Sequence, residues 1–387
     1  MKSIRPTIEI RATPPHRQRG ISNRAVLGLV VVAFLIGIAG SLAVRAPGAA
    51  SKAAAAGAVG TLDNVKWRLP VAFATNLPAL GDGILYVAEA ARLSSAGRTN
   101  LEVFEPGKLV PAFSITDGVK DRKIEAGYTW LGYDQGKIPA SPLLSAVPFG
   151  MEPWEFTAWW YEGGGDKLAD ELYGAHGIKP LLCGIMGPEA AGWFRNEVRA
   201  LDDLKGLKIR FAGLGGRVMQ KLGASVTVLP GGEIFPALER GVIDATEFSM
   251  PAIDERLGFF KLVKNNYFPG WHQTFTALHL IVNKENWDRL SPASRAQLEV
   301  VCTAATLRTL SRGEAAQGKA LAAFKASGVN LRSLPEPVLR EIQKANDEVL
   351  AEEAAKDPLF KKILDSQRAF SAAYKPWKSL GYLPRNF

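Results

Sequence analysis

The chain has 387 residues, a formal net charge of +9 and 22% charged residues. A chain of this length exceeds one compact core and fits about two domains. Residues 1–60 hold eight Lys or Arg against one Glu, so the remainder carries only about +2. Basic residues do not gather in one run and no zinc-finger spacing presents them, so we expect no nucleic-acid partner.

A basic leader, residues 1–24, precedes an uncharged and mostly apolar run, residues 25–44, which is long enough for a bilayer-spanning helix. Residues 45–65 form a flexible linker that is rich in small residues and contains sites a signal peptidase accepts. A cleaved signal and an uncleaved anchor both fit this pattern, and either one exports the remainder of the chain. No cysteine lies near the apolar run, which argues against a lipoprotein.

Strand-like and helical stretches then alternate along the chain. The predicted elements are a strand at 66–73, a helix at 81–93, a strand at 101–104, a helix from 113 to 119, and apolar strands at 181–185 and 277–282. Such alternation predicts an α/β fold with mixed or parallel sheets.

The chain becomes helical and Ala-rich from Ser291 onward. Ser291 followed by Pro292 begins one helix, and Pro335 or Glu336 begins another. The last helix, from Asp357, carries apolar residues at helical spacing. It can pack on its own body or on a partner subunit.

Cys183 and Cys302 are the only cysteines. They lack metal-ligand spacing, and no His or Asn pattern marks either one as a nucleophile. In an exported protein two distant thiols can pair or stay buried separately, and we favour separate thiols.

Arg210 ends a predicted strand, 207–209, that runs into a turn containing Gly213, Gly215 and Gly216. A guanidinium delivered in this way is well placed to clamp a carboxylate, because its planar fork matches two carboxylate oxygens. An interdomain ion pair is the alternative role.

Several segments in this order resemble the extracytoplasmic solute receptors of tripartite ATP-independent periplasmic (TRAP) transporters, most closely the branch that binds 2-oxo acids and related monocarboxylates. The segments are KGLKIR ending at Arg210, GEIFPALE (232–239), GVIDATE (241–247), AVPFG (146–150), GWFR (192–195) and YFPGW (267–271). The resemblance covers roughly residues 67–387.

The resemblance implies an α/β, two-domain periplasmic-binding-protein-like fold with hinge strands and a long C-terminal helix. Domain I is expected at 66–182 plus 277–325, domain II at 183–276, and a C-terminal helical region at 326–387. The strands at 181–185 and 277–282 would be the crossings between domains. The family is normally released into the periplasm, so we favour signal cleavage. Its oxo-acid branch also suggests a homodimer through the C-terminal helix.

The same resemblance assigns roles to residues. Arg210 matches the arginine that grips the ligand carboxylate. Glu247 matches an acidic residue that contributes to a bound cation, although a helix-start cap is its alternative role. The following family position is Trp, thought to offer a backbone carbonyl to the metal, and here it is Phe248. Glu189 stands where the branch has a Gln that helps hold cation and ligand.

Two carboxylates facing one ion would favour Ca²⁺ over Na⁺. Alternatively, one carboxyl group stays protonated or pairs with a cationic part of another ligand. Glu189 therefore weakens the inference to pyruvate-like ligands. No organic cofactor is expected.

Further ligand-contacting candidates are Tyr133, whose family counterpart reaches the ligand through its hydroxyl, Phe73, which replaces a usual Trp, and Asn76. Other residues near these motifs are interpreted as structural: Trp193, Trp271, Arg195, His272 and His279.

The sequence thus predicts a binding protein whose domains close on a small carboxylate and present it to TRAP membrane subunits. An exported metal-assisted enzyme is one alternative, with Glu189 and Glu247 as acid and base. It lacks support because no catalytic triad, phosphate loop or dinucleotide fingerprint is present. A membrane-tethered ligand sensor is the other alternative. The sequence does not identify which carboxylic acid the protein binds.

Overall fold

The computed structural model describes residues 61–383. The predicted basic leader and signal or anchor segment, and most of the linker, lie outside the described residues. Within 61–383, no helix is both long enough and apolar enough to traverse a bilayer.

The described residues form alternating strands and helices, as the sequence predicts. The strands are β1 (Val65–Pro70), β2 (Thr99–Phe104), β3 (Ala126–Thr129), β4 (Ile178–Met186), β5 (Gly192–Phe194), β6 (Lys208–Arg210), β7 (Ser225–Thr227), β8 (Ala245–Thr246), β9 (Asn265–Phe268), β10 (Thr276–Asn283) and β11 (Asn330–Ser333). The helices are α3 (Gly83–Ser94), α4 (Ile115–Lys120), α5 (Pro153–Glu162), α6 (Gly165–Gly174), α7 (Gly213–Lys221), α8 (Gly231–Glu239), α9 (Pro251–Leu257), α10 (Lys284–Asp288), α11 (Pro292–Ala326), α12 (Glu336–Lys356) and α13 (Pro358–Gly381).

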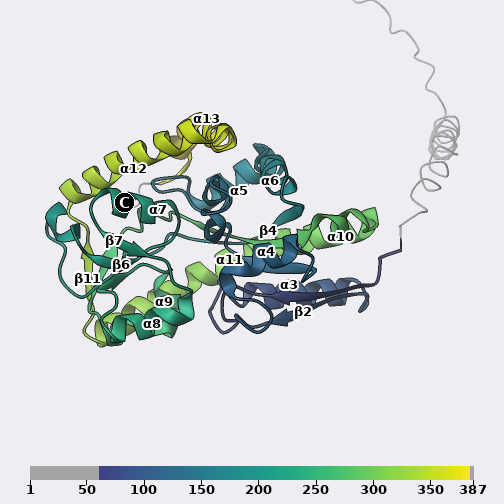
Figure 1. The fold of residues 1–387 in the computed structure, drawn as a ribbon, viewed down its shortest axis with the longest axis horizontal. Coiled ribbons are helices and arrows are strands. Elements are labelled where there is room, and N and C mark those ends of the chain that lie inside the picture. The colour runs from purple at the N-terminus through teal and green to yellow at the C-terminus, as the bar shows by residue number, and fades with distance from the viewer. Residues whose placement is uncertain (1–60, 384–387) are drawn as a thin grey trace, which may run out of the picture. The chain divides into compact units, whose positions relative to one another are not determined.

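The first lobe is built on β1 to β4 and β10. Strands β1 and β2 pair in parallel, and β10 lies between β3 and β4, antiparallel to both. A bridge between Val71 and Tyr128 links the two sheets. Strand β10 is buried at every position, and five of its eight residues are apolar. Helices α3 to α6 lie in this half of the body (Figure 1).

The second lobe is built on a six-stranded sheet with the order β11-β9-β5-β8-β6-β7. Strands β7, β6 and β8 run parallel to one another, whereas β5 is antiparallel to both β8 and β9. Helices α7, α8 and α9 lie with this sheet (Figure 1). Strand β11 is an unpredicted member, because the sequence indicated only helices beyond residue 326.

Strands β4 and β10 include the segments 181–185 and 277–282 that the sequence analysis expects as crossings between domains, and the chain builds β5 to β9 of the second sheet between them. Helix α11 begins at Pro292 with Ser291 as its N-cap, as predicted. It packs along β4 and α3 and, further on, along α9, so it touches both lobes. The expected domain boundaries near residues 182 and 276 stay a prediction.

A disulfide joins Cys183 in β4 to Cys302 in α11. The expectation of separate thiols was therefore wrong. The two cysteines are 119 residues apart in sequence, and only the packing of α11 on β4 brings them together.

The C-terminal region consists of β11, α12 and α13. Helix α12 packs on α7, and α13 turns back over α5 and α6 of the first lobe (Figure 1). The first half of α13 is held by the buried side chains Phe360, Ile363, Leu364 and Gln367. The long C-terminal helix expected from the sequence is thus present and packs on its own chain.

Candidate functional site

Arg210 and Glu247 meet because two parallel strands end at the same edge of the sheet. Arg210 ends β6, and Glu247 directly follows β8, whose Thr246 is the register partner of Arg210. Nη1 of Arg210 lies 2.5 Å from Glu247 Oε1 and 2.9 Å from the Glu247 carbonyl oxygen. Nε donates to the carbonyl of Leu229, and the Ala212 amide donates to Glu247 Oε1 at 2.7 Å. Both side chains of the pair are buried.

Gly213 lets the chain turn from β6 into α7 under the first lobe. Its φ of +67° lies in the left-handed region, and a Cβ there would be 2.7 Å from the Trp130 ring. A side chain at this position would therefore push the two lobes apart beside Arg210.

Glu189 lies in the connection from β4 to β5, which runs beside the connection from β9 to β10. Its amide donates to the carbonyl of Gln273 at 3.1 Å. Its Oε1 accepts from Thr276 Oγ1 at 2.7 Å, and Gln273 Nε2 donates to the same hydroxyl. The approach is so close that a Cβ at Gly270 would lie 2.2 Å from the Glu189 carbonyl oxygen. Two backbone crossings thus fix the position of the Glu189 carboxylate.

These groups surround a small cavity of about 20 Å³ between the lobes. Its lining consists of Phe73, Leu80, Trp130, Tyr133, Glu189, Arg210, Ala212, Glu247, Phe248, Gln273 and Thr276. All the predicted site residues except Asn76 are among them. Asn76 is exposed and does not line the cavity, so the structure does not support its predicted ligand contact.

Aromatic rings from both lobes form the cavity wall. Phe73 packs on Tyr133 with ring centroids 5.8 Å apart, and on Phe248 at 6.5 Å. The guanidinium carbon of Arg210 lies 5.3 Å from the centre of the Phe248 ring, a cation–π contact. Burial raises the pKa of Tyr133 to about 12, so its hydroxyl stays protonated and can donate a hydrogen bond.

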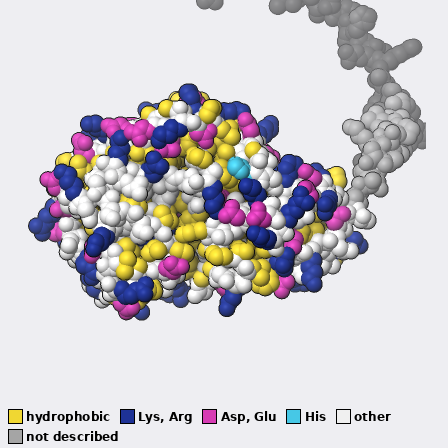
Figure 2. All heavy atoms as spheres, in the orientation of Figure 1, with side chains coloured by type: hydrophobic (Ala, Val, Ile, Leu, Met, Phe, Trp, Pro, Cys, Tyr) yellow, Lys and Arg dark blue, Asp and Glu magenta, His cyan; other side chains and the backbone are white. Residues whose placement is uncertain are grey.

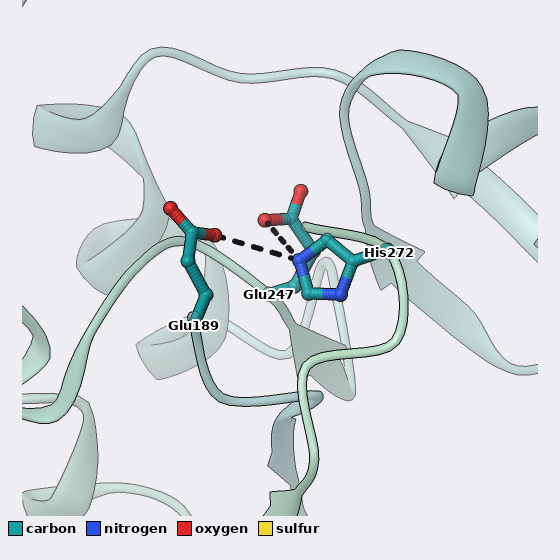
Figure 3. Close-up of side chains that lie close together, drawn as sticks. All are labelled: Glu189, Glu247 and His272. Carbon is teal, nitrogen blue, oxygen red and sulfur yellow. Dashed lines mark ion pairs between the residues drawn. The ribbon is translucent and has the colours of Figure 1, made fainter. Parts of the chain in front are cut away.

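His272 lies between the two carboxylates (Figure 3). Its Nε2 is 3.5 Å from Glu189 Oε2 and 3.6 Å from Glu247 Oε2, which are ion-pair distances. Neither His272 Nε2 nor Glu189 Oε2 makes a hydrogen bond among the described residues. Within the described part of the chain, these three residues are the group of acidic and histidine ligands close enough to share one metal ion, with ligand atoms within 4.8 Å of one another.

Burial and the neighbouring charges shift the pKa values of Glu189, Glu247 and His272. Burial raises the pKa of the Glu189 carboxyl. Burial also acts to raise that of Glu247, but the Arg210 charge and His272 together hold the pKa of Glu247 below its usual range. For His272, burial opposes the charged form, yet the two glutamates outweigh it and raise the pKa to about 9.

Sequence reasoning missed three polar members of the site, His272, Gln273 and Thr276. The sequence analysis gave His272 a structural role near a hinge strand, and the structure places it, buried, beside the two carboxylates. Its only sequence signal was its position next to the crossing strand at 277–282.

Three of the other residues interpreted as structural, Trp193, Arg195 and Trp271, have structural partners. Trp193 donates to Asp254 at 2.8 Å, and Arg195 donates to the carbonyl of Leu238. The ring of Trp271 stacks on Phe149.

The sequence model of family 7 of the bacterial extracellular solute-binding proteins, DctP, matches residues 73–357. The chain belongs to this family. Solved structures of TRAP periplasmic binding proteins share the fold of this protein, with two domains and a long C-terminal helix. Its family comprises solute receptors of transporters, so the protein is a solute-binding protein and not an enzyme.

Three relatives are similar to this DctP protein over most of its length. A monocarboxylate 2-oxoacid-binding periplasmic protein of Nostoc sp. is 35% identical over 83% of this chain and 88% of its own length. A TRAP solute-binding protein of Pseudoalteromonas atlantica, solved with sodium and pyruvate, is 36% identical with a TM-score of 0.79, covering 81% of this chain and 96% of its own. A third, from Bordetella bronchiseptica, is 31% identical with a TM-score of 0.80, covering 81% of this chain and 94% of its own. It is a mixed-occupancy dimer with copurified calcium and picolinate in one site.

Proposed function

We propose that this protein captures a small organic monocarboxylate, a 2-oxo acid or a related acid, in the periplasm and delivers it to TRAP membrane subunits. The observation that carries the proposal is the buried guanidinium of Arg210 in the cavity between the lobes. Its Nε and Nη1 donate to the Leu229 carbonyl and to Glu247, and the Tyr133 hydroxyl also contacts the guanidinium. These contacts hold the planar fork at the cavity wall, where a ligand carboxylate would bind it beside the Tyr133 hydroxyl.

Ligand entry requires the lobes to separate. A cavity of about 20 Å³ has room for about one water molecule, so it is too small for any 2-oxo acid. The site draws Phe73, Trp130 and Tyr133 from the first lobe and Arg210, Glu247 and Phe248 from the second. Opening therefore separates the aromatic wall from the guanidinium, and closing encloses the acid between them.

A cation completes the proposed site. Each carboxylate has one oxygen fixed by the protein, Glu247 Oε1 by Arg210 and Ala212, and Glu189 Oε1 by Thr276. The second oxygen of each carboxylate lies at ion-pair distance from His272 Nε2, so a metal ion would bind these two oxygens once His272 has lost its proton. Two carboxylate oxygens suit Ca²⁺ better than Na⁺, because the doubly charged ion neutralises both. The relatives solved with calcium or sodium support an ion of this type.

We also propose a homodimer through the end of α13. Beyond its packed first half, the helix exposes Trp377, and Leu380 and Leu383 extend the apolar surface. Exposed apolar side chains of this size gathered at one helix end mark an interaction surface. The dimer of the Bordetella relative supports this assignment.

A thermal-shift series on the purified protein tests the proposed ligand. Pyruvate, longer 2-oxo acids, 2-hydroxy acids and aromatic acids are each added with Ca²⁺, Na⁺ or a chelator. We expect a 2-oxo acid to raise the melting temperature in the parent and in Arg195→Ala, whose arginine lies outside the cavity, but not in Arg210→Ala. Stabilisation that is equal in Arg210→Ala, or absent with every acid, would overturn the proposal.

A further inference from the structure

A cleft of about 540 Å³ adjoins the carboxylate cavity between the lobes. Its volume falls within the range of pockets that enclose small organic ligands. Phe73 and Phe248 line both spaces, so these two rings form the partition between them. On the face drawn in Figure 2, hydrophobic side chains gather between the halves that carry α8 and β2. Gly232 and Glu233 of the cleft lining are exposed, so the cleft continues the carboxylate site towards the surface.

Each lobe contributes one ring to this partition. Phe73 follows β1 in the first lobe, Phe248 follows β8 in the second, and their ring planes meet at 69°. Phe248 also packs on Phe259 with ring centroids 6.3 Å apart, and a Cβ at Gly231 would lie 2.6 Å from its ring. Because the rings belong to different lobes, the partition parts when the lobes separate. A ligand that binds Arg210 can then place its body between the two rings.

The cleft is apolar over most of its wall. Its apolar lining residues are Ala72, Phe73, Ala74, Leu77, Pro106, Pro111, Ala112, Pro230, Phe248 and Leu257. Such a wall favours an uncharged, apolar body, because burial removes that body from water. The two phenyl rings and the three proline rings offer flat surfaces, and aromatic rings pack well against surfaces of this kind. The body that fits best is therefore an aromatic ring.

The charged side chains of the cleft are both acidic. Glu105 accepts hydrogen bonds from the Thr75 amide at 3.1 Å and from the Thr75 hydroxyl, and Glu233 lies in the first turn of α8. Among the described residues, no Lys or Arg lines the cleft. A second carboxylate on the ligand would therefore meet like charges there without a compensating cation. The cleft favours an acid whose only charge is the carboxylate at Arg210.

We infer that this cleft is the side-chain subsite of the receptor, and that the acid it takes is a monocarboxylate with an aromatic side chain. Arg210 binds the carboxylate, Phe73 and Phe248 lie on either side of the chain that leads from it, and the cleft beside α8 encloses the ring. The small cavity has no room for the body of an acid, and this cleft supplies that room. The inference rests on the proposed function of the Arg210 site and names the class of its ligand.

Calorimetric titration of the full chain with phenylpyruvate, pyruvate and 2-oxoglutarate, each with Ca²⁺, tests the subsite. We expect phenylpyruvate to bind at least about tenfold more tightly than pyruvate, because its ring is buried in the cleft. The second carboxylate of 2-oxoglutarate approaches Glu105 and Glu233, so this acid should bind at least about tenfold more weakly than phenylpyruvate. Binding of both phenylpyruvate and pyruvate should be lost in Arg210→Ala.

A variant that fills the cleft separates the subsite from the carboxylate cavity. Gly232 lines the cleft, and a Cβ there meets no atom within 4 Å, so Gly232→Trp places its side chain in open space. We expect this variant to weaken phenylpyruvate binding at least about tenfold more than pyruvate binding. Gly318→Trp is the matched control, because Gly318 lies in α11 outside the cleft and has equally open surroundings. It should leave the binding of both acids unchanged.

The possible failures are distinguishable. If neither acid shows binding that depends on Arg210, the proposed function itself is overturned. If pyruvate binds through Arg210 and phenylpyruvate binds no more tightly, only the aromatic subsite is overturned. Equal weakening of both acids in Gly232→Trp contradicts a separate subsite in the cleft. Equal affinity for 2-oxoglutarate and phenylpyruvate contradicts selection for a single charge.

Discussion

Arg210 and Glu247 form a charge pair whose side chains are both almost fully enclosed. Removing one partner of such a pair leaves an uncompensated buried charge and costs about 3–5 kcal/mol, whereas the intact pair adds little net stability. We therefore interpret the Arg210–Glu247 pair as part of a ligand site and not as a source of folding stability. Any loss of binding in Arg210→Ala has to be measured alongside its folding.

Glu189→Gln removes the carboxylate that most distinguishes this site from a sodium site. We expect Ca²⁺ affinity, measured by calorimetric titration, to fall at least about tenfold, because one of the two anionic ligands is replaced by a neutral amide. Ligand binding in Na⁺ should persist. Glu285→Gln, on exposed α10, serves as the control, and unchanged Ca²⁺ affinity in Glu189→Gln would remove Glu189 from the cation site.

His279 predicts a pH dependence of stability that is separate from the ligand site. It is buried in β10 beside Trp160, neither ring nitrogen has a hydrogen-bond partner among the described residues, and burial lowers its pKa to about 3. Below about pH 6.5 the unfolded chain binds a proton at this residue that the folded chain refuses, so its contribution to stability is lost as the pH falls towards 3.

Urea unfolding of the parent and of His279→Leu between pH 7 and 4.5 measures this contribution. We expect the unfolding free energy of the parent to fall more steeply than that of the variant, by up to about 1.4 kcal/mol per pH unit. Parallel slopes would mean that His279 is protonated in the folded protein.

At the level of residues, sequence reasoning found what lies in recognisable segments. Arg210 ends one recognisable segment and Glu247 ends another, and the structure places the two side chains in contact. His272 escaped because its partners, Glu189 and Glu247, are far away in sequence, and only the pairing of the two crossings brings them together. Asn76 shares its turn with Phe73, yet its side chain points to solvent, which the sequence pattern does not encode.

At the level of elements, the short strands of the second lobe were the hardest to predict. Strands β7 and β8 have three and two residues, too few for an alternation to show, whereas β6 was predicted from the alternation of residues 207–209. The long strands β4 and β10 were predicted because burial on both faces makes most of their residues apolar. Helices α11 and α12 were marked by Pro near their first residue.

The disulfide between β4 and α11 should be a large stabilising element. Because it closes a loop of about 120 residues in the unfolded chain, its loss should lower the unfolding free energy by about 2–5 kcal/mol. Denaturant unfolding of the oxidised parent against a Cys183→Ala, Cys302→Ala double variant and against the reduced parent checks this. Equal stability of the oxidised and reduced parent would show that the bond contributes nothing.

At the level of the whole molecule, the two lobes have separate sheets but share α11 and the crossings. The proposed closing of the lobes would bend the connections at 187–191 and 269–275, the same segments that carry Glu189 and His272. Under this proposal, ligand binding in the cavity is coupled to the movement of the lobes through these segments.

The exposed end of α13 predicts that the purified protein is a dimer in solution. Light scattering after size exclusion should give twice the chain mass for the parent, and one chain mass for a Trp377→Glu, Leu380→Glu variant, because the charges disrupt an apolar contact. Lys361→Gln, in the packed half of α13, should stay dimeric. A monomeric parent would show that the apolar end has another partner or none.

Calorimetric titration of pyruvate in the presence of Ca²⁺ tests whether Arg210 clamps a ligand carboxylate. We expect one site per chain in the parent and in Arg195→Ala, and binding at least about a hundredfold weaker in Arg210→Ala that is still folded by circular dichroism. Binding of equal strength in folded Arg210→Ala, or no binding of pyruvate or any longer 2-oxo acid by the parent, would contradict an arginine-clamped carboxylate receptor.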